Sequence, residues 1–417
     1  MIRKGLRDAD RGALAEDMRI LLITETLAAG GAETFVVRLA NALVAAHDVT
    51  IAVLIGQFSN PALEAQVNQS VHLEQLRLPA LRTLNKLDGL ARRVGVDFSL
   101  IRWIQRRWLR NLIRKTKPDV AHSHLFKADR LVTETREVRS AMRHVTTLHG
   151  DYAPFLSNLA DPQMLKLSER MQTTLGRVDS IVSICAEQEE FVRDRFPDVQ
   201  RKLVRIYNGF EPWRPIVEPS SRPDRPLRFG MASRGVKLKG WSKAIAAFSK
   251  LKRGAAELIL VGEGKYLAEL RAQPVLSGVR FVGFSDNPVD WLIDCDVCLL
   301  PSEFPNESLP TAVMEYLFCA KPVIATDVGE IATMIRTPTG KLAGTLLSFE
   351  EGRVSVDDLA AAMQSYVDDP ALRRRHAALA PAAFAKFDMG ACAAAYARLY
   401  ADALEPDAIN SSISATH

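Results

Sequence analysis

The sequence predicts an α/β fold built from two doubly wound parallel sheets. Short runs of apolar and β-branched residues alternate with helical stretches in two separate blocks, which is typical of parallel βαβ units. Between the blocks, residues 210–226 contain five prolines and show no hydrophobic periodicity, so we interpret them as a linker between domains. A chain of 417 residues has the length expected for two such domains.

The expected strands define an N-terminal domain, residues 19–209, and a C-terminal domain, residues 227–385. In the first block the apolar runs lie at residues 19–23, 49–55, 118–122, 144–148, 180–184 and 203–207, with a helix at about 32–46. In the second block they lie at residues 227–231, 257–261, 279–282, 297–300 and 323–326, and a last helix is expected at 391–404 within the segment 386–404. Because ligands bind at the carboxyl ends of the strands in such sheets, we expect the two domains to face each other across a cleft.

The composition is that of an ordinary globular protein, with 47% hydrophobic and 25% charged residues. The net charge, 54 − 49 = +5, is too small to indicate nucleic-acid binding by itself. The cysteines lie in apolar runs at 185, 295, 298, 319 and 392, so we interpret them as reduced core residues rather than metal or redox ligands. Residues 1–18 contain acids without an apolar segment, and no run is long enough to span a bilayer, which predicts a cytoplasmic or peripheral protein.

Two glutamates, Glu307 and Glu315, flank the expected start of a helix that directly follows an apolar strand. The helix is predicted at residues 311–319, since Pro310 precedes it and apolar residues recur within it at core spacing. Free backbone N–H groups at a helix N-terminus bind anions such as phosphate, whereas carboxylates accept hydrogen bonds from sugar and ribose hydroxyls. The pattern therefore predicts a phosphate site between two hydroxyl sites. A capped helix with one solvated glutamate is the alternative that the spacing leaves open.

Further motifs accompany this pair in order along the chain. They are Gly30-Gly31-Ala32-Glu33, Tyr207-Asn208-Gly209, Arg234 with Lys239-Gly240, Gly262-Glu263-Gly264, and Pro301-Ser302 ahead of the two glutamates. Together they resemble the motifs of glycosyltransferase family 4 (glycosyl transferases group 1) over residues 19–404. The resemblance implies a GT-B fold, with two Rossmann-like domains facing across a cleft and a C-terminal helix that packs back on the N-terminal domain. It also implies retaining transfer of a sugar from a nucleotide diphosphate-sugar, without a metal or other cofactor.

The resemblance assigns roles to the residues of the C-terminal domain. In the family the first glutamate, here Glu307, touches the donor sugar, and the second, here Glu315, binds the nucleotide ribose. Arg234 and Lys239 follow a strand end, where two cations can neutralise charge that grows on the leaving diphosphate. A solvated cation pair on a loop is the plainer alternative. Glu263 is expected beside the nucleotide base.

The backbone N–H groups of Ser308 and Leu309, at the mouth of the same helix, are expected to add donors to the phosphate. Ser308, Ala320 and Glu330 stand where the family has glycine. The stretch Asp294-Cys-Asp296 has the letters of a metal-binding DxD motif, but its second aspartate opens a buried strand. We therefore expect no metal there.

In the N-terminal domain, His149 ends an expected strand and is followed by a glycine. The family has a histidine at this place that contacts the donor sugar or polarises the reacting centre. His122 and His124 lie at a similar strand end and compete for this role, and a structural role is open for all three. Gly30 and Gly31 allow close backbone approach before a helix N-terminus, which the resemblance connects with donor phosphate or acceptor; a plain tight turn is the alternative.

We expect catalysis to rest on His149, Arg234, Lys239 and Glu307. No residue is identifiable as a general base, and no carboxylate stands out as a nucleophile. This favours front-face substitution in which the leaving phosphate takes the acceptor proton, with the enzyme supplying positioning and charge stabilisation.

Residues 81–117 are strongly basic, with eleven Lys or Arg against two Asp. Within them Arg102, Arg106, Arg110 and Arg114 form an i, i+4 row beside an apolar helix face, which suits an anionic membrane surface. This predicts a lipid-linked glycan or glycolipid acceptor, as in cell-surface polysaccharide or lipopolysaccharide synthesis. A solvated helix packed on the sheet is the alternative. No nucleic-acid recognition motif accompanies the basic segment.

Two other functions remain open. An epimerase with the same fold would act on the nucleotide sugar itself, and it would need an acid/base set but no acceptor. A catalytically inactive scaffold of a polysaccharide assembly complex would need none of the charged motif residues, so the presence of Arg234, Lys239, Glu307 and Glu315 argues against it.

Overall fold

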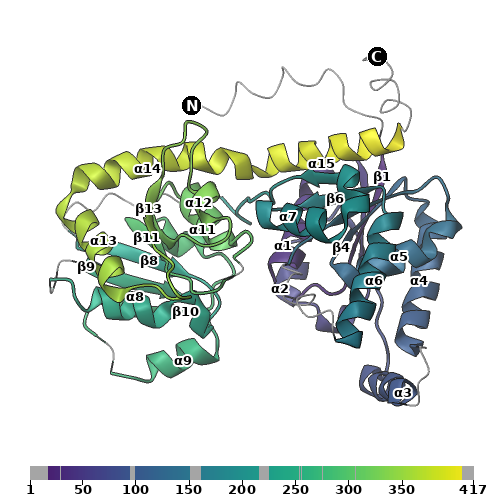
Figure 1. Cartoon of the computed structure of the whole chain (residues 1–417), viewed down its shortest axis with the longest axis horizontal. Helices are drawn as coiled ribbons and strands as arrows, with labels where there is room; N and C mark the ends of the chain where they lie inside the picture. Colours follow the sequence, from purple (N-terminus) through teal and green to yellow (C-terminus); the bar gives the residue numbers. More distant parts are fainter. Residues whose placement is uncertain are drawn as a thin grey trace. The chain divides into compact units, whose positions relative to one another are not determined.

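The computed structural model describes residues 17–28, 30–93, 99–150, 161–215, 225–252, 254, 256–274, 276–305 and 307–405. These residues divide into two compact units (Figure 1). Unit 1 comprises residues 17–184, 188–209 and 389–405, and unit 2 comprises residues 185–187 and 210–388. Most of the expected linker lies outside the described residues, and its first residue, Phe210, is buried in unit 2 against the rings of Phe318 and Phe384.

Unit 1 is built on a seven-stranded sheet in which all pairings are parallel. Its strands are β1 (Arg19–Thr24), β2 (Asp48–Val53), β3 (His72–Gln75), β4 (Val120–His124), β5 (Arg143–Thr147), β6 (Ser180–Ser183) and β7 (Leu203–Arg205). Their order across the sheet is β3-β2-β1-β4-β5-β6-β7. The order changes direction between β1 and β4, so the carboxyl ends of these two strands flank the switch point where ligands bind in such sheets.

Helices lie on both faces of this sheet (Figure 1). They are α1 (Gly31–Leu43), α2 (Pro61–Glu64), α3 (Leu81–Arg93), α4 (Leu100–Thr116), α5 (Phe126–Thr135), α6 (Pro162–Arg177), α7 (Ala186–Arg195) and α15 (Met389–Leu404). On one face α1 and α15 contact each other and the sheet, and on the other α5 contacts α4, α6 and the sheet. Burial on both faces explains why the central strands are apolar throughout instead of alternating.

Unit 2 repeats this plan with a six-stranded parallel sheet of order β10-β9-β8-β11-β12-β13. Its strands are β8 (Leu227–Ala232), β9 (Ala256–Val261), β10 (Val279–Gly283), β11 (Val297–Leu300), β12 (Val323–Thr326) and β13 (Gly344–Leu347). Its helices are α8 (Trp241–Phe248), α9 (Lys265–Arg271), α10 (Val289–Leu292), α11 (Thr311–Phe318), α12 (Ile331–Met334), α13 (Val356–Asp368) and α14 (Pro370–Phe384). Phe229, Trp241 and Tyr366 are fully buried in the apolar cluster between the sheet, α8 and α13. The switch point of this sheet lies between β8 and β11.

The structure confirms the predicted α/β class with two doubly wound sheets and adds two strands that the sequence analysis missed. Both are edge strands. β3 has the sequence His-Leu-Glu-Gln and no buried residue, and β13 is a four-residue segment that begins with glycine. An edge strand has a neighbour on one side only, so its sequence lacks the continuous apolar run that identifies the central strands.

Helix α15 belongs to unit 1 although it follows unit 2 in the chain. It contacts α1 and β5, and its Tyr396 and Tyr400 are fully buried. The hydroxyl of Tyr400 lies 2.6 Å from Nδ1 of His122. Gly209 allows the start of α15 to approach, since a Cβ on Gly209 would lie 2.8 Å from Cα of Met389. The C-terminal helix therefore completes one face of the unit 1 sheet.

A buried polar cluster lies between α5 and the strands β4 and β5. Oδ1 of Asp129 accepts hydrogen bonds from the hydroxyls of Ser123 and Thr146, each at 2.6 Å. Because Ser123 donates to Asp129, Nε2 of His144 donates to the Ser123 oxygen at 2.8 Å. Burial raises the pKa of Asp129 to about 7 and lowers the pKa of His144 to about 3. The cluster therefore favours an uncharged carboxyl and an uncharged imidazole.

Asp129→Asn and His144→Gln should change the pH dependence of stability in opposite directions. Between pH 3.8 and about 7 the folded state keeps a proton on Asp129 that the unfolded chain releases, so Asp129 lowers stability as pH rises. Between pH 6.5 and about 3 the unfolded chain binds a proton on His144 that the folded state excludes, so His144 lowers stability as pH falls. Each effect amounts to at most about 1.4 kcal/mol per pH unit.

Denaturant unfolding measured across this pH window checks the expectation. Asp129→Asn should make stability fall more steeply on acidification than in the unmodified chain, and His144→Gln should make it fall less steeply. Identical slopes in all three proteins would contradict the assigned protonation states.

Candidate active site

The predicted site residues of each unit lie at or just after the carboxyl ends of the strands that flank the switch point of its sheet, or of a strand next to these. In unit 1 the loop after β1 ends at Gly30 and α1 begins at Gly31, β4 ends at His124, and His149 follows β5. In unit 2 the corresponding loops follow β8, β9 and β11. Because the carboxyl ends of parallel strands lie at one edge of a sheet, each set gathers at one edge of its own unit.

The loops of unit 2 pack backbone against backbone at positions where glycine leaves out a side chain. Gly240, in the loop after β8, has φ +82°, and a Cβ there would lie 1.9 Å from the carbonyl oxygen of Pro301 in the loop after β11. Gly235 meets the loop after β9 in the same way, since its Cβ would lie 2.6 Å from the backbone nitrogen of Gly264. These contacts hold three neighbouring loops in one arrangement.

Lys239 and Glu307, from two of these loops, form a buried ion pair in which the side chains are 9% and 5% exposed. Lys239 Nζ and the hydroxyl of Ser302 both contact Oε1 of Glu307, the latter at 2.5 Å. Gly329 supports Glu307 from the loop after β12, since a Cβ there would lie 2.2 Å from the Glu307 carbonyl oxygen. The second carboxylate oxygen, Oε2, accepts no hydrogen bond from another described residue. One carboxylate oxygen of Glu307 is thus held by hydrogen bonds within the protein, and the other is available to accept a hydrogen bond from a ligand.

Arg234 differs from Lys239, although the sequence analysis treated the two as an equivalent pair. Arg234 is exposed, and its guanidinium forms no ion pair with any residue in the described part of the chain. Its carbonyl oxygen accepts a hydrogen bond of 2.9 Å from Nε1 of the buried Trp241, which anchors the loop. Arg234 therefore presents a full positive charge, whereas the charge of Lys239 is shared with Glu307.

Helix α11 begins at Thr311, where the sequence predicted its start. Ser308 and Leu309 precede the helix, and their backbone N–H groups donate to no other described residue. Glu315 lies one turn inside the helix and is 9% exposed. Glu263 is exposed in the loop after β9, beside Gly262. The helix mouth, Glu315 and Glu263 thus follow two strands that are separated in the sheet only by β8.

The loop after β1 contains a carboxylate whose role sequence reasoning missed. Glu33, in the first turn of α1, folds back over Gly30, where a Cβ would lie 2.3 Å from its Oε2. Oε1 of Glu33 lies 3.2 Å from the hydroxyl of Thr26, and burial raises the pKa of Glu33. A carboxylate at this helix mouth favours hydroxyl groups over phosphate as ligands. The sequence feature that could have indicated this carboxylate is the acidic residue three positions after Gly30.

The three competing histidines form one cluster in which only His149 is partly exposed. Nε2 of His149 lies 2.8 Å from Nδ1 of His124, and its ring packs against Phe35 with centroids 5.5 Å apart. His122 is buried, with its ring nitrogens 2.6 Å from Tyr400 and 2.8 Å from Thr147. Burial lowers the pKa of His122, His124 and His149, so the cluster is uncharged near neutral pH.

Family models match both units. The model for glycosyltransferase family 4 matches residues 29–214, and the model for glycosyl transferases group 1 matches residues 226–369. The chain belongs to the GT4-type glycosyltransferases. It therefore has the GT-B transferase fold that the motifs predicted.

This glycosyltransferase is similar to proteins of several functions. The glycogen synthase of Mycobacterium tuberculosis (strain H37Rv) is 25% identical over 407 residues, which cover 92% of this chain and 94% of the relative. A crystal structure of Anabaena HepE in complex with UDP has a TM-score of 0.68 at 17% identity, over 92% of this chain and 100% of that chain. Sucrose-phosphate synthase from Thermosynechococcus elongatus has a TM-score of 0.67 at 19% identity, over 92% and 98% of the two chains.

The DxD-like stretch of the glycosyltransferase lies away from these loops, at the amino end of β11. Arg225 Nη1 contacts Asp296 Oδ2 at 2.7 Å, and the guanidinium of Arg228 contacts Asp294. The carboxylates thus serve ion pairs with arginines. The five cysteines are buried, and burial raises the pKa of the Cys295 thiol to about 12, which is typical of an inert core thiol.

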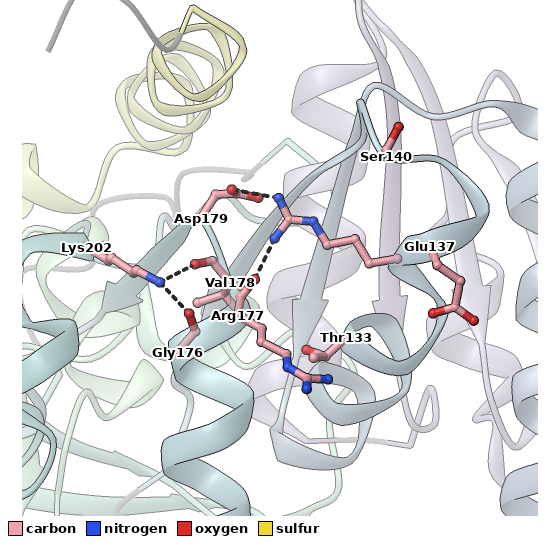
Figure 2. Close-up of a pocket in the computed structure, with 9 residues that line it drawn as sticks. Thr133, Glu137, Ser140, Gly176, Arg177, Val178, Asp179 and Lys202 are labelled. Atoms are coloured by element: carbon pink, nitrogen blue, oxygen red, sulfur yellow. Dashed lines mark hydrogen bonds and ion pairs between the residues drawn. The ribbon is translucent and has the colours of Figure 1, made fainter. Parts of the chain in front are cut away.

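A cavity of about 490 Å³ in unit 1 is lined by residues that include Gly176, Asp179 and Lys202 (Figure 2). Asp179, which lines it, directly precedes β6 and so lies at the amino end of that strand. Nζ of Lys202 donates to the carbonyl oxygens of Gly176 and Val178 at 2.7 and 2.9 Å, and Arg136 donates to Asp179 at 2.8 Å. These cations satisfy the C-terminal end of α6, so we interpret the cavity as structural.

Gly240→Ala should destabilise the glycosyltransferase more than Gly340→Ala. The two glycines have φ of +82° and +83°, so alanine at either position carries the same strain of a left-handed backbone, about 1–2 kcal/mol. At Gly240 the new Cβ would also lie 1.9 Å from the Pro301 carbonyl oxygen, whereas nothing lies within 4 Å of it at Gly340. Denaturant unfolding of both variants measures the difference, which we expect to exceed about 1 kcal/mol. Equal losses would contradict the close packing of these loops.

Proposed function

We propose that this glycosyltransferase moves a sugar from a nucleoside diphosphate-sugar to an acceptor hydroxyl with retention of configuration. The observation that carries the proposal is the unit 2 loop set, where the exposed Arg234 follows β8 ahead of the buried Lys239–Glu307 pair. A diphosphate requires cations and a sugar requires hydrogen-bond acceptors, and these loops supply both. The UDP complex of the structurally similar HepE supports a nucleotide-sugar donor.

The charge that develops on the leaving diphosphate would be neutralised by Arg234 and Lys239. Backbone N–H groups of Ser308 and Leu309 would add hydrogen-bond donors to the same oxygens. These groups are part of the folded loops, so they need little reorganisation when the sugar–phosphate bond breaks. We infer that the enzyme requires neither a metal ion nor an organic cofactor.

The remaining site residues would bind the neutral parts of the substrates. Glu307 would accept a donor-sugar hydroxyl through its Oε2, Glu315 a ribose hydroxyl, and Glu263 would lie beside the base. His149 would contact the donor sugar. In unit 1 the Gly30–Gly31 turn, with the Glu33 carboxylate over it, would orient an acceptor hydroxyl.

Retention follows if the acceptor oxygen attacks the anomeric carbon on the face from which the diphosphate leaves. The bond between the anomeric carbon and the phosphate oxygen breaks, and a bond to the acceptor oxygen forms. The proton of the acceptor hydroxyl passes to the leaving phosphate oxygen. This step needs no protein base, in agreement with the lack of an assigned one among the site residues.

Arg234→Ala should weaken nucleoside diphosphate binding about tenfold or more, because it removes a charge-assisted hydrogen bond. Thermal shift with UDP, GDP, ADP and CMP measures this, since a ligand that binds the folded state raises the Tm. We expect one diphosphate to raise the Tm and EDTA to leave that shift unchanged.

The matched control is Lys252→Ala, which removes an exposed cation on the opposite side of unit 2, before β9. It should retain the full shift, and the unliganded Tm of both variants should equal that of the unmodified protein. No shift with any nucleotide would overturn the donor-site proposal and favour the inactive-scaffold alternative.

Helices α3 and α4 suggest what the acceptor is. Leu87 and Leu90 on α3 are 49% and 59% exposed, and Trp103 on α4 is 50% exposed. Asp88 of α3 is buried and accepts a hydrogen bond of 2.7 Å from the Leu100 N–H at the start of α4, so its carboxylate is not part of the exposed surface. The exposed cations of these two helices include Arg82, Lys86 and Arg107.

The predicted arginine row of α4 is divided between two roles. In the C-terminal half Leu109 and Leu112 are buried on the sheet. Near the middle of the helix, Arg106 and Arg110 pair with Glu137 at 3.2 and 3.5 Å. The N-terminal half keeps Trp103 and Arg107 at the surface. Because α4 runs antiparallel to β4, which follows it, this half lies toward the carboxyl edge of the sheet, as the site residues do.

We infer that α3 and the first half of α4, here called the basic apolar surface, contact an anionic lipid surface. Exposed leucines and a tryptophan beside exposed cations are the features that bind such a surface. No helix in the described residues is long and apolar enough to cross a membrane. The acceptor would then be a lipid-linked glycan or glycolipid of cell-surface polysaccharide or lipopolysaccharide synthesis.

Replacing Leu87, Leu90 and Trp103 together by serine should reduce sedimentation of the protein with vesicles that contain anionic phospholipid. Binding should also fall on adding salt, because screening weakens the attraction of the cations. The control is Phe284→Ser, which removes an aromatic ring of unit 2 that is 60% exposed. Equal binding of the triple variant and the control would overturn the membrane contact while leaving the donor site untouched.

A further inference from the structure

The histidine cluster of unit 1 contains one fully buried ring nitrogen that has no hydrogen-bond partner among the described residues. His122 uses both of its nitrogens, with Tyr400 and Thr147. His124 is fully buried and uses only Nδ1, which lies 2.8 Å from Nε2 of His149. Its other nitrogen, Nε2, is buried and has no hydrogen-bond partner. This unpaired nitrogen decides which way the hydrogen bond between His124 and His149 runs.

Two arrangements of protons satisfy the His124–His149 contact when both rings are neutral. In the first, His124 carries its proton on Nδ1 and donates to Nε2 of His149, whose own proton is then on Nδ1. In the second, His149 donates from Nε2, and the proton of His124 is on the buried Nε2. The arrangements differ in what they leave unpaired on the buried Nε2 of His124: a lone pair in the first and an N–H group in the second.

The first arrangement is the more stable of the two. Orphaned N–H groups are rare in protein interiors, and an acceptor without a partner is tolerated more often. Both rings are neutral, since burial lowers the pKa of each. The rings of His122 and Phe35, with centroids 4.1 and 6.2 Å from that of His124, restrict any reorientation that would find a new partner.

We propose that His124 is a positioning residue that holds His149 in the tautomer with its proton on Nδ1, so that His149 acts on its ligand as a hydrogen-bond donor. Nδ1 of His149 donates to no other described residue, and the His149 ring is partly exposed. The oxygen that it meets is that of the donor sugar, which rests on the function proposed above. A histidine in this state does not remove the acceptor proton through Nδ1, in accord with a reaction in which the leaving phosphate takes it.

The tautomer is measured directly on the unliganded protein. Protonated and unprotonated imidazole nitrogens have well-separated ¹⁵N shifts, so a long-range ¹H–¹⁵N spectrum of histidine-labelled protein distinguishes them. Spectra of His149→Gln and His124→Asn assign the two rings. We expect His149 to carry its proton on Nδ1 near neutral pH, and a proton on Nε2 would overturn the proposal whatever the substrate is.

Kinetics test whether this state matters. His124→Asn keeps an N–H donor at about the place of Nδ1, whereas His124→Leu removes it. We expect His124→Leu to lower kcat about 10- to 100-fold, as loss of a supporting hydrogen bond does at other sites, and His124→Asn to restore most of the loss. In the leucine variant the spectrum should show His149 with its proton on Nε2, the form that free histidine prefers in water.

The matched control is His144→Gln, which replaces another buried histidine of this unit that makes no contact with His149. It should keep kcat, and all variants should keep the UDP or other nucleotide shift of the unmodified protein. If His124→Leu does not fold, the tautomer measurement and the asparagine variant still decide the question. Equal kcat in the leucine and unmodified proteins would overturn the positioning role, whereas a missing nucleotide shift would count against the proposed function instead.

Discussion

The unit 2 site depends on backbone contacts that only glycine permits. Gly240 lets the loop after β8 meet the carbonyl oxygen of Pro301 at a distance that any side chain would block, and Gly329 does the same for Glu307. Because the backbones are in contact, the side chains that leave them have little freedom in direction. Lys239 and Glu307 are brought together from positions 68 residues apart in this way. The glycines of the motifs thus contribute to the site by fixing the geometry of the loops that carry its side chains.

A buried ion pair is costly to form, because both charges lose their hydration. Removing one partner leaves the other charge buried without compensation, which typically costs about 3–5 kcal/mol. A substitution at Lys239 or Glu307 therefore changes stability and ligand binding together. Arg234 is exposed and takes part in no ion pair among the described residues, so its removal should change ligand binding more than stability. At the proposed phosphate site the two cations thus have different physical roles, and a substitution of each tests a different property.

The fold could be predicted from the sequence where a strand is buried on both faces of its sheet. Strands such as β1 and β11 are covered on both faces, and this gives continuous apolar runs that identify them in the sequence. β3 and β13 were missed because an edge strand needs less apolar surface and is short. Phe210 was assigned to the linker because prolines dominate its neighbourhood, although its ring is held by two phenylalanines far along the chain. Contacts of that kind leave no local pattern.

The candidate site residues could be proposed from the sequence, but their pairings could not. Order and spacing identified Arg234, Lys239, Glu307 and His149, since these properties are local. The pairings depend on which strand ends are neighbours in the folded sheets. Lys239 forms an ion pair with Glu307, and His124 forms a hydrogen bond with His149 instead of competing with it for a role. In the sheet of unit 1, β4 and β5 are adjacent, so the histidines that follow their carboxyl ends meet. A list of candidate residues therefore becomes a mechanism only when the strand order shows which of them share their protons and charges.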